Sequence, residues 1–215
     1  MRKIHTIIFV VLIAVVLTAC TSSGDNIYKA LEATAAKEAD FENQQEPLKK
    51  LETSEKEIFD QIMELGMKEF DQISKLADNA IANLDQREEH LKKEKNSIEE
   101  SKKEFHLATE EFKKIKDEKL KNQANELQEL MNKRYESYDK LYSAYLNGLQ
   151  EDRKIYEIIK NEDLKLEDLE AQIEASNKAY ENVFEANQHF NEQTEKFNKA
   201  KLKFYEDSGL KIETK

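Results

Sequence analysis

The sequence predicts an all-α protein, folded as an elongated, left-handed, up-and-down four-helix bundle. Its 215 residues include only four glycines and one proline, the residues that most often end helices and form turns. Charged residues make up 37% of the chain, and Glu and Lys favour helices. Apolar residues recur at steps of three, four and seven, which predicts helices with one buried face and argues against a disordered acidic chain. A repeat of 3.5 residues per turn imposes the left-handed twist.

The first two helices are predicted over residues 27–65 and 68–117, because the apolar phase slips between these ranges. Gly66 suits the left-handed position that follows a helix. Pro47 lies inside the first range and, because proline lacks an amide donor, it would kink that helix or start it anew. The second range keeps one heptad position apolar throughout, at Leu84, Leu91, Ile98, Phe105 and Phe112.

The third helix is predicted over residues 123–160, where Asn125 and Gln128 have the spacing of a capping box. The range contains Asn147-Gly148, which is a common turn dipeptide. We predict helix across it because the apolar phase is unbroken, at Tyr145, Leu149 and Tyr156. A turn at this dipeptide would instead give a five-helix arrangement.

The fourth helix is predicted over residues 165–206, after Asn161 and Asp163 interrupt the pattern. A helix of about forty residues is ~60 Å long. Short connections make consecutive helices antiparallel neighbours. The four ranges therefore predict one long bundle with no second domain.

The N-terminus predicts export and lipid attachment. Arg2 and Lys3 precede a mostly apolar run that is too short for a comfortable membrane span, which needs ~20 residues. The run ends in Leu17-Thr18-Ala19-Cys20, which resembles the bacterial lipobox, and Cys20 is the only cysteine in the chain. The alternatives are an ordinary secretory signal with a chance cysteine, or an uncleaved anchor.

This interpretation divides the chain into four segments. Residues 1–19 form a lipoprotein signal peptide, and residues 20–26 form the lipidated cysteine with a polar tether. Residues 27–206 form the four-helix bundle, and residues 207–215 form a frayed tail. The protein is expected outside the cytoplasm, held on the outer face of the cell membrane by lipid on Cys20.

Composition and motifs exclude several classes of function. The net charge is −11, which disfavours binding to nucleic acid. There is no glycine-rich phosphate loop, no nucleophile elbow and no Cys/His dyad, so no enzyme is predicted. The Glu-x-x-His pairs of two-metal bundles are also absent, and neither a metal nor another cofactor is predicted.

Tyrosines follow one face of the third predicted helix. Exposed aromatic rings could stack on sugars, which makes Tyr135 and Tyr142 candidates for contact with a glycan or a partner. The favoured alternative is core packing, because these positions share the register of the buried face. On that basis Tyr138 and Tyr145 are predicted to be mostly buried, and Tyr135 and Tyr142 to face the bundle with their hydroxyls near its edge.

The second predicted helix carries a polar series beside its apolar one, at Arg87, Glu94 and Ser101. Arg87 and Glu94 could form a polar layer that binds a ligand. The favoured alternative is control of helix register, which polar residues in a packed seam often provide.

Three segments carry a resemblance to a known family: LGMKEFDQISKLADNAI (65–81), REEHLKKEKNSIEESKKEF (87–105) and NEDLKLEDLEAQIEASNKAY (161–180). With the lipobox, they make the chain similar to the YkyA-type cell-wall binding lipoproteins of low-GC Gram-positive bacteria. The resemblance implies an up-and-down four-helix bundle on the outer face of the membrane. Lipidation at Cys20 is the one functional position that it transfers.

The predicted function is therefore that of a non-enzymatic, lipid-anchored envelope protein that binds the cell wall or acts as a scaffold. The alternative is an envelope adaptor or chaperone that binds another protein through exposed helix faces. Exposed apolar residues outside the packed seam would favour this alternative.

Overall fold

The computed structural model describes residues 18–65 and 69–209, and within them every regular element is a helix. The prediction of an all-α fold is thereby confirmed. The five α-helices are α1 (Thr18–Ala36), α2 (Ala39–Glu64), α3 (Phe70–Phe112), α4 (Glu118–Ile159) and α5 (Leu166–Asp207). None of the helices in these two ranges has the length and apolar character needed to cross a membrane.

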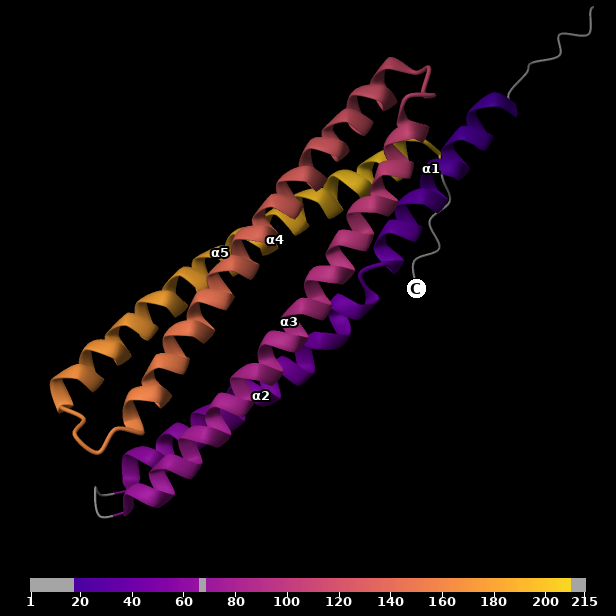
Figure 1. Cartoon of the computed structure of the whole chain (residues 1–215). Coiled ribbons are helices and arrows are strands. Elements are labelled where there is room, and N and C mark those ends of the chain that lie inside the picture. Colours follow the sequence, from indigo (N-terminus) through magenta and orange to yellow (C-terminus); the bar gives the residue numbers. More distant parts are fainter. Residues whose placement is uncertain (1–17, 66–68, 210–215) are drawn as a thin grey trace, which may run out of the picture.

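The five helices make four long rods (Figure 1). Helices α1 and α2 follow each other nearly in line and form one rod, and α3, α4 and α5 each reverse the direction of the chain. Helix α3 packs on α1, α2 and α4, and α4 also packs along α5. The arrangement is thus an elongated up-and-down bundle, as predicted.

The predicted helix at 27–65 is wrong in one respect, because the chain breaks between α1 and α2 at Lys37 and Glu38. In a continuous helix the amide of Phe41 would donate to the carbonyl of Lys37. Here the hydroxyl of Ser97 stands between them: it donates to that carbonyl at 2.7 Å and accepts from the Phe41 amide at 3.1 Å. The break therefore depends on a side chain from α3. Pro47, which is predicted to kink or restart the helix, lies inside α2 and does not end it.

Three boundaries also differ from those predicted, and one of them is the end of α3, which lies at Phe112 and not near residue 117. Helix α1 begins at Thr18, so residues 20–26 are helical and not an extended tether; once a helix is anchored downstream, each added residue costs little. Helix α4 begins at Glu118 and not near residue 123, because the Asp117 side chain caps it by accepting from the Leu120 amide at 2.9 Å. Helix α5 agrees with its predicted range within one residue at each end.

Several predicted features lie outside the described residues. These are most of the signal peptide (residues 1–17), Gly66 in the connection between the first two predicted helices, and the end of the tail (residues 210–215). The side chain of Cys20 is likewise not described, although its backbone belongs to α1.

The Asn147-Gly148 dipeptide is helical, as predicted, and Gly148 marks a close approach between helices. A Cβ atom added there would lie 3.2 Å from the ring of Tyr180 on α5. That separation is shorter than ordinary van der Waals contact between carbon atoms. The glycine lets the tyrosine ring lie directly on the backbone of α4.

The core consists of two hydrophobic clusters along the bundle. The cluster around α1 and the ends of α3 and α5 is rich in aromatic rings, such as Phe105 and Phe204. The cluster around α2 is built mainly from aliphatic side chains, such as Leu84 and Leu149, with Tyr156 among them. Glu94 of α3 lies between Leu91 of the second cluster and Ile98 of the first. The bundle thus has a polar position where its two clusters meet.

Candidate binding groove

A groove with a volume of about 700 Å³ runs between α2 and α5. It lies beside the junction of the two hydrophobic clusters, and α3 and α4 form its floor. Its lining residues come from all four of these helices. The side chains that matter below are Phe41, Gln45, Glu94, Tyr138, Tyr142, Phe190, Asn187 and Asn191.

The groove combines aromatic rings with planar polar groups. Asn187 and Asn191 stand on one edge, one turn apart on α5, and their amides are hydrogen-bonded at 3.3 Å. Gln45 stands on the α2 edge and donates to the carboxylate of Glu94 at 2.5 Å. Amides offer both donors and acceptors, and rings offer apolar faces. Pockets of this volume, with few convergent polar groups, are typical of ligand sites.

The tyrosines of α4 divide between core and groove. Tyr135 is only 2% exposed and its hydroxyl lies 3.0 Å from that of Ser101, so its ring offers no free face. Tyr138 is fully buried, and Tyr145 is less completely buried, so that most of its surface is covered as predicted. Tyr142 is half-buried and lines the groove. Of the two candidate contact residues, Tyr142 is the one whose ring reaches a ligand-sized space.

Glu94 is a buried acid on the groove floor. It is 5% exposed, and burial raises its pKa to about 7, although Tyr138 and Gln45 act to lower it. Desolvation disfavours the charged form of a carboxylate, which is why its proton is held more tightly. Glu94 can therefore change its charge near neutral pH.

Arg87 forms a polar layer inside the bundle, below the groove. It is 2% exposed, and its guanidinium donates to the hydroxyls of Tyr145 at 2.8 Å and Tyr180 at 3.1 Å. Tyr145 in turn donates to Glu52, and Tyr180 donates to Asp152 at 2.5 Å. The layer joins α2, α3, α4 and α5, which is the arrangement expected of a residue that fixes helix register.

A second polar layer holds the break between α1 and α2. Arg134 of α4 makes a two-pronged ion pair with Glu38, at 2.7 and 2.6 Å. Ser101 also donates to Glu38 at 2.7 Å. Such paired, charge-assisted bonds are stronger and more directional than neutral ones. Ser101, the third residue of the predicted polar series, thus helps to hold the helix break and does not face a ligand site.

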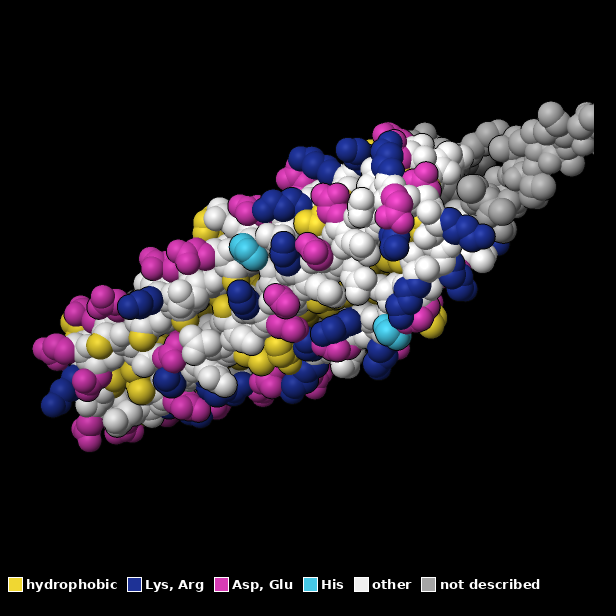
Figure 2. Space-filling model, turned by 90° about the horizontal axis from the view of Figure 1, so that it is seen from above, with side chains coloured by type: hydrophobic (Ala, Val, Ile, Leu, Met, Phe, Trp, Pro, Cys, Tyr) yellow, Lys and Arg dark blue, Asp and Glu magenta, His cyan; other side chains and the backbone are white. Residues whose placement is uncertain are grey.

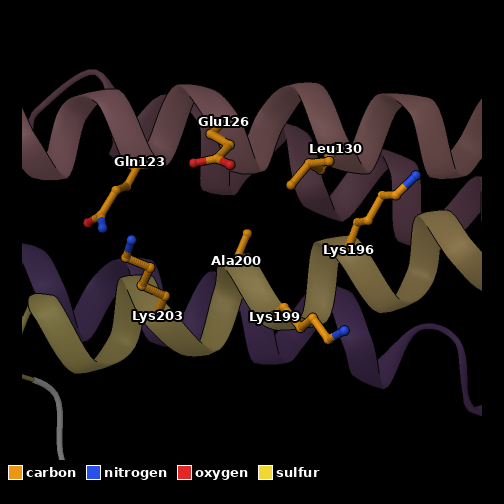
Figure 3. Close-up of a pocket in the computed structure, with 7 residues that line it drawn as sticks. All are labelled: Gln123, Glu126, Leu130, Lys196, Lys199, Ala200 and Lys203. Carbon is orange, nitrogen blue, oxygen red and sulfur yellow. The ribbon is translucent and has the colours of Figure 1, made fainter.

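A shallower hollow of about 420 Å³ lies between α4 and α5 (Figure 3). Three lysines surround it, together with Glu126, Leu130 and Gln123. Lys203 points toward Gln123, whereas the amino groups of Lys196 and Lys199 point away from the centre. Lys199 is also paired with Glu195 at 2.5 Å. The lysines do not converge on one point, so this hollow is a weaker candidate than the groove.

The surface around these sites is densely charged. Figure 2 shows acidic and basic side chains interspersed over one whole face, with apolar side chains visible between them. No three His, Cys, Asp or Glu residues within the described ranges are grouped so that they could hold a metal ion.

Comparison with known proteins gives the family. The family model described as "YkyA: Putative cell-wall binding lipoprotein" matches residues 22–207. The chain belongs to the YkyA family. A relative from Bacillus subtilis (strain 168), "Uncharacterized lipoprotein YkyA", is 36% identical over 201 residues, which cover 93% of this chain and 90% of the relative. The family resemblance seen in the sequence is thus confirmed.

A solved structure supports the YkyA fold found here. The 1.6 Å crystal structure of a conserved protein of unknown function from Staphylococcus aureus superposes with a TM-score of 0.74. The match covers 86% of this chain and 94% of that protein, at 16% sequence identity. At this identity the likeness concerns the all-helical fold alone.

Proposed function

We propose that this protein is a non-enzymatic, lipid-anchored protein of the cell envelope that binds a wall polymer in the groove between α2 and α5. The observation that carries the proposal is the groove itself, which joins aromatic rings to amide and carboxylate groups. The description of the family as cell-wall binding agrees with this function.

The envelope location rests on the N-terminus and on the family. Cys20 ends a lipobox-like sequence, and both the family model and the Bacillus relative are described as lipoproteins. The backbone of Cys20 lies in the first turn of α1, which forms one end of the bundle. Lipid attached there would hold the bundle by its end, so that the rod projects from the membrane.

A glycan is the wall component that best fits the groove. Sugars present hydroxyl groups around the edge of an apolar ring face, and amide side chains both donate to and accept from such hydroxyls. Asn187 and Asn191 supply those amides on the α5 edge, and the half-buried ring of Tyr142 supplies an aromatic face.

A binding function, without catalysis, agrees with how the groove carboxylates are engaged. Glycoside hydrolysis uses a pair of carboxyl groups that face the scissile bond. Here Glu52 accepts from Tyr145 and Glu94 accepts from Gln45. Glu52 and Glu94 are therefore both engaged by side chains of the protein, and the third groove acid, Glu46, has no partner acid placed to act with it in the described contacts.

The test is a pull-down of the whole chain, purified in detergent, on isolated wall sacculi. Replacing both Asn187 and Asn191 by Ala should weaken binding about tenfold, because two amide contacts of roughly 0.5–1.5 kcal/mol each are lost. The matched control replaces Asn177 and Asn182, two exposed amides of α5 that do not line the groove. Equal binding by both double variants would overturn the proposal.

The protein-binding alternative has one observation in its favour. Leu166, Phe184 and Leu202 are 65%, 62% and 48% exposed and stand 18 residues apart on α5. Eighteen residues make five helical turns, so the three side chains share one face. They are nonetheless ~27 Å apart along the helix, and isolated exposed apolar residues are common on soluble surfaces. Crosslinking that depends on Phe184 and not on Asn191 would favour a protein partner.

A further inference from the structure

Glu94 is a buried carboxylate without a cation. Its hydrogen-bond partner is the neutral amide of Gln45, and it belongs to no ion pair within the part of the chain that the structure describes. The nearby groove residue Arg134 is occupied, because both of its terminal nitrogens bind Glu38. Buried charges in proteins are normally paired. An unpaired acid on the floor of a groove therefore points to a cationic ligand.

The hydroxyl of Tyr138 is a second polar group beside Glu94. It is buried, it interacts with the Glu94 carboxylate, and it has no other hydrogen-bond partner among the described residues. Tyr138 and Glu94 both line the groove. A protonated amine carries three N–H donors, and two oxygens at this position could accept two of them.

The remainder of the groove also favours a cation. Three carboxylates line it, from Glu46, Glu52 and Glu94, against Lys49 and the already paired Arg134. The aromatic rings of Phe41 and Phe190 lie against that of Tyr138, at centroid distances of 5.7 and 5.6 Å. The charged ends of Lys95 and Arg134 already lie 5.9 and 4.9 Å from the ring centroids of Tyr138 and Phe190. The preference for a cation therefore rests on the excess of carboxylates, which also repels a polymer that carries phosphates or carboxylates.

We propose that the groove recognises a glycan through a free amino sugar, such as a glucosamine unit whose nitrogen carries no acetyl group. The protonated amino group binds Glu94 and the Tyr138 hydroxyl, and the amides of the α5 edge bind the sugar hydroxyls. This inference rests on the proposed function, since it names the ligand of the same groove. A sugar fits better than a peptide amine, because the α5 edge offers two amides that can bind sugar hydroxyls and contributes no carboxylate to the groove.

Calorimetric titration of the whole chain with two short glycans tests the inference. The probes are a tetrasaccharide of glucosamine and the matching tetrasaccharide of N-acetylglucosamine. The amino form should bind about tenfold more tightly, the gain expected from one charge-assisted contact. Glu94→Gln keeps the size and the Gln45 contact of the side chain and should abolish this preference.

Two further variants separate a local contact from general attraction to an acidic protein. Glu89→Gln removes one charge from an exposed position of α3 and should leave the preference unchanged. Tyr138→Phe removes only the hydroxyl and should reduce the preference without loss of the fold. Thermal unfolding of each variant shows whether the bundle remains intact.

Three results would overturn the inference: equal affinity for both tetrasaccharides, an unchanged preference in Glu94→Gln, or tighter binding of Nα-acetyl-lysine amide than of the amino glycan. The sacculus experiment distinguishes these results from failure of the proposed function. If the Asn187 and Asn191 variant loses sacculus binding while the tetrasaccharides bind equally, the groove remains the wall site and the amino sugar is rejected.

Discussion

At the scale of single residues, Arg87 shows how a buried charge can be accommodated in a helical bundle. Its guanidinium has tyrosine hydroxyls on two helices as direct acceptors, and carboxylates of Glu52, Glu55 and Asp152 lie 3.7–3.9 Å away. Removing the cation would leave the buried Asp152 and the half-buried Glu55 without compensation.

Arg87→Met should therefore lower the free energy of unfolding by about 3–5 kcal/mol, the usual cost of breaking a buried ion pair on one side. Denaturant unfolding followed by circular dichroism measures it. The matched control is Arg153→Met, which breaks the more exposed pair with Asp85 and should cost less than about 1 kcal/mol. Similar losses in both variants would contradict the central role of Arg87.

Glu94 gives a pH-dependent prediction with a definite sign. Burial raises its pKa in the folded protein from 4.5 to about 7. Hydrogen bonds with Tyr138 and Gln45 act to lower this pKa, and the charge of Glu52 acts to raise it. The folded state binds this proton more tightly, so the protonated side chain stabilises the protein fully below pH 4.5. That contribution is lost as the pH rises through about 7.

The Glu94→Gln variant should lack this loss. Its free energy of unfolding relative to wild type should increase between pH 5 and pH 8, by on the order of 2 kcal/mol. Chemical unfolding of both proteins over this pH range measures the difference between their free energies of unfolding. The other titrating groups contribute equally to both proteins, so their effect cancels in this difference. A difference that does not change with pH would mean that the Glu94 carboxyl is not desolvated.

At the scale of elements, the break between α1 and α2 is specified by contacts across the bundle. Ser97 of α3 bridges the Lys37 carbonyl and the Phe41 amide, and Glu38 is held by Arg134 and Ser101. Two helices, α3 and α4, thus supply the side chains that hold the break, and Ser97 takes the place of one missing helix hydrogen bond.

Ser97→Ala should destabilise the protein by about 1–3 kcal/mol, because it leaves backbone groups of the break without partners. Hydrogen exchange should accelerate at the Phe41 amide in particular. Ser143→Ala is the matched control, since Ser143 bonds to a backbone carbonyl on an exposed face. Unchanged exchange at Phe41 in the Ser97 variant would contradict the bridging role.

The helices could be predicted from the sequence because apolar periodicity is a local signal. Leu84, Leu91 and Ile98 are all buried, as their heptad spacing indicates. The break at Lys37 could not be predicted in this way, because Ser97 lies 60 residues away along the chain. The start of α4 differs from the predicted residue 123 because the helix is capped by Asp117 and does not begin at the capping-box spacing of Asn125 and Gln128.

Only the residues that α3 and α4 contribute to the candidate site could be predicted from the sequence. Tyr142 and Glu94 are candidates from the sequence because they occupy regular positions on predicted helices. Gln45, Asn187 and Asn191 carry no motif, and two asparagines four residues apart on a helix are unremarkable until α2 lies opposite α5. The groove is a property of how the rods are assembled, which one helix pattern cannot specify.

At the scale of the whole molecule, the proposed attachment places lipid at one end of a rod. The α3 helix alone has 43 residues, which corresponds to ~65 Å. The groove begins near Phe41, beyond the end of α1, so it lies well along the rod from Cys20. Attachment by the end would leave the groove free to meet a polymer layer above the membrane.

Cys20→Ala should release the protein from the membrane or leave it as unprocessed precursor. A diacylated cysteine supplies two acyl chains, which anchor stably, whereas the acidic body of the protein is not attracted to anionic lipid head groups. Cell fractionation and metabolic labelling with a fatty acid measure both effects. The control is Ser23→Ala, which changes a nearby residue and should leave labelling and membrane retention intact. Normal processing and full membrane retention of the Cys20 variant would show that the chain is held by something other than lipid on this cysteine.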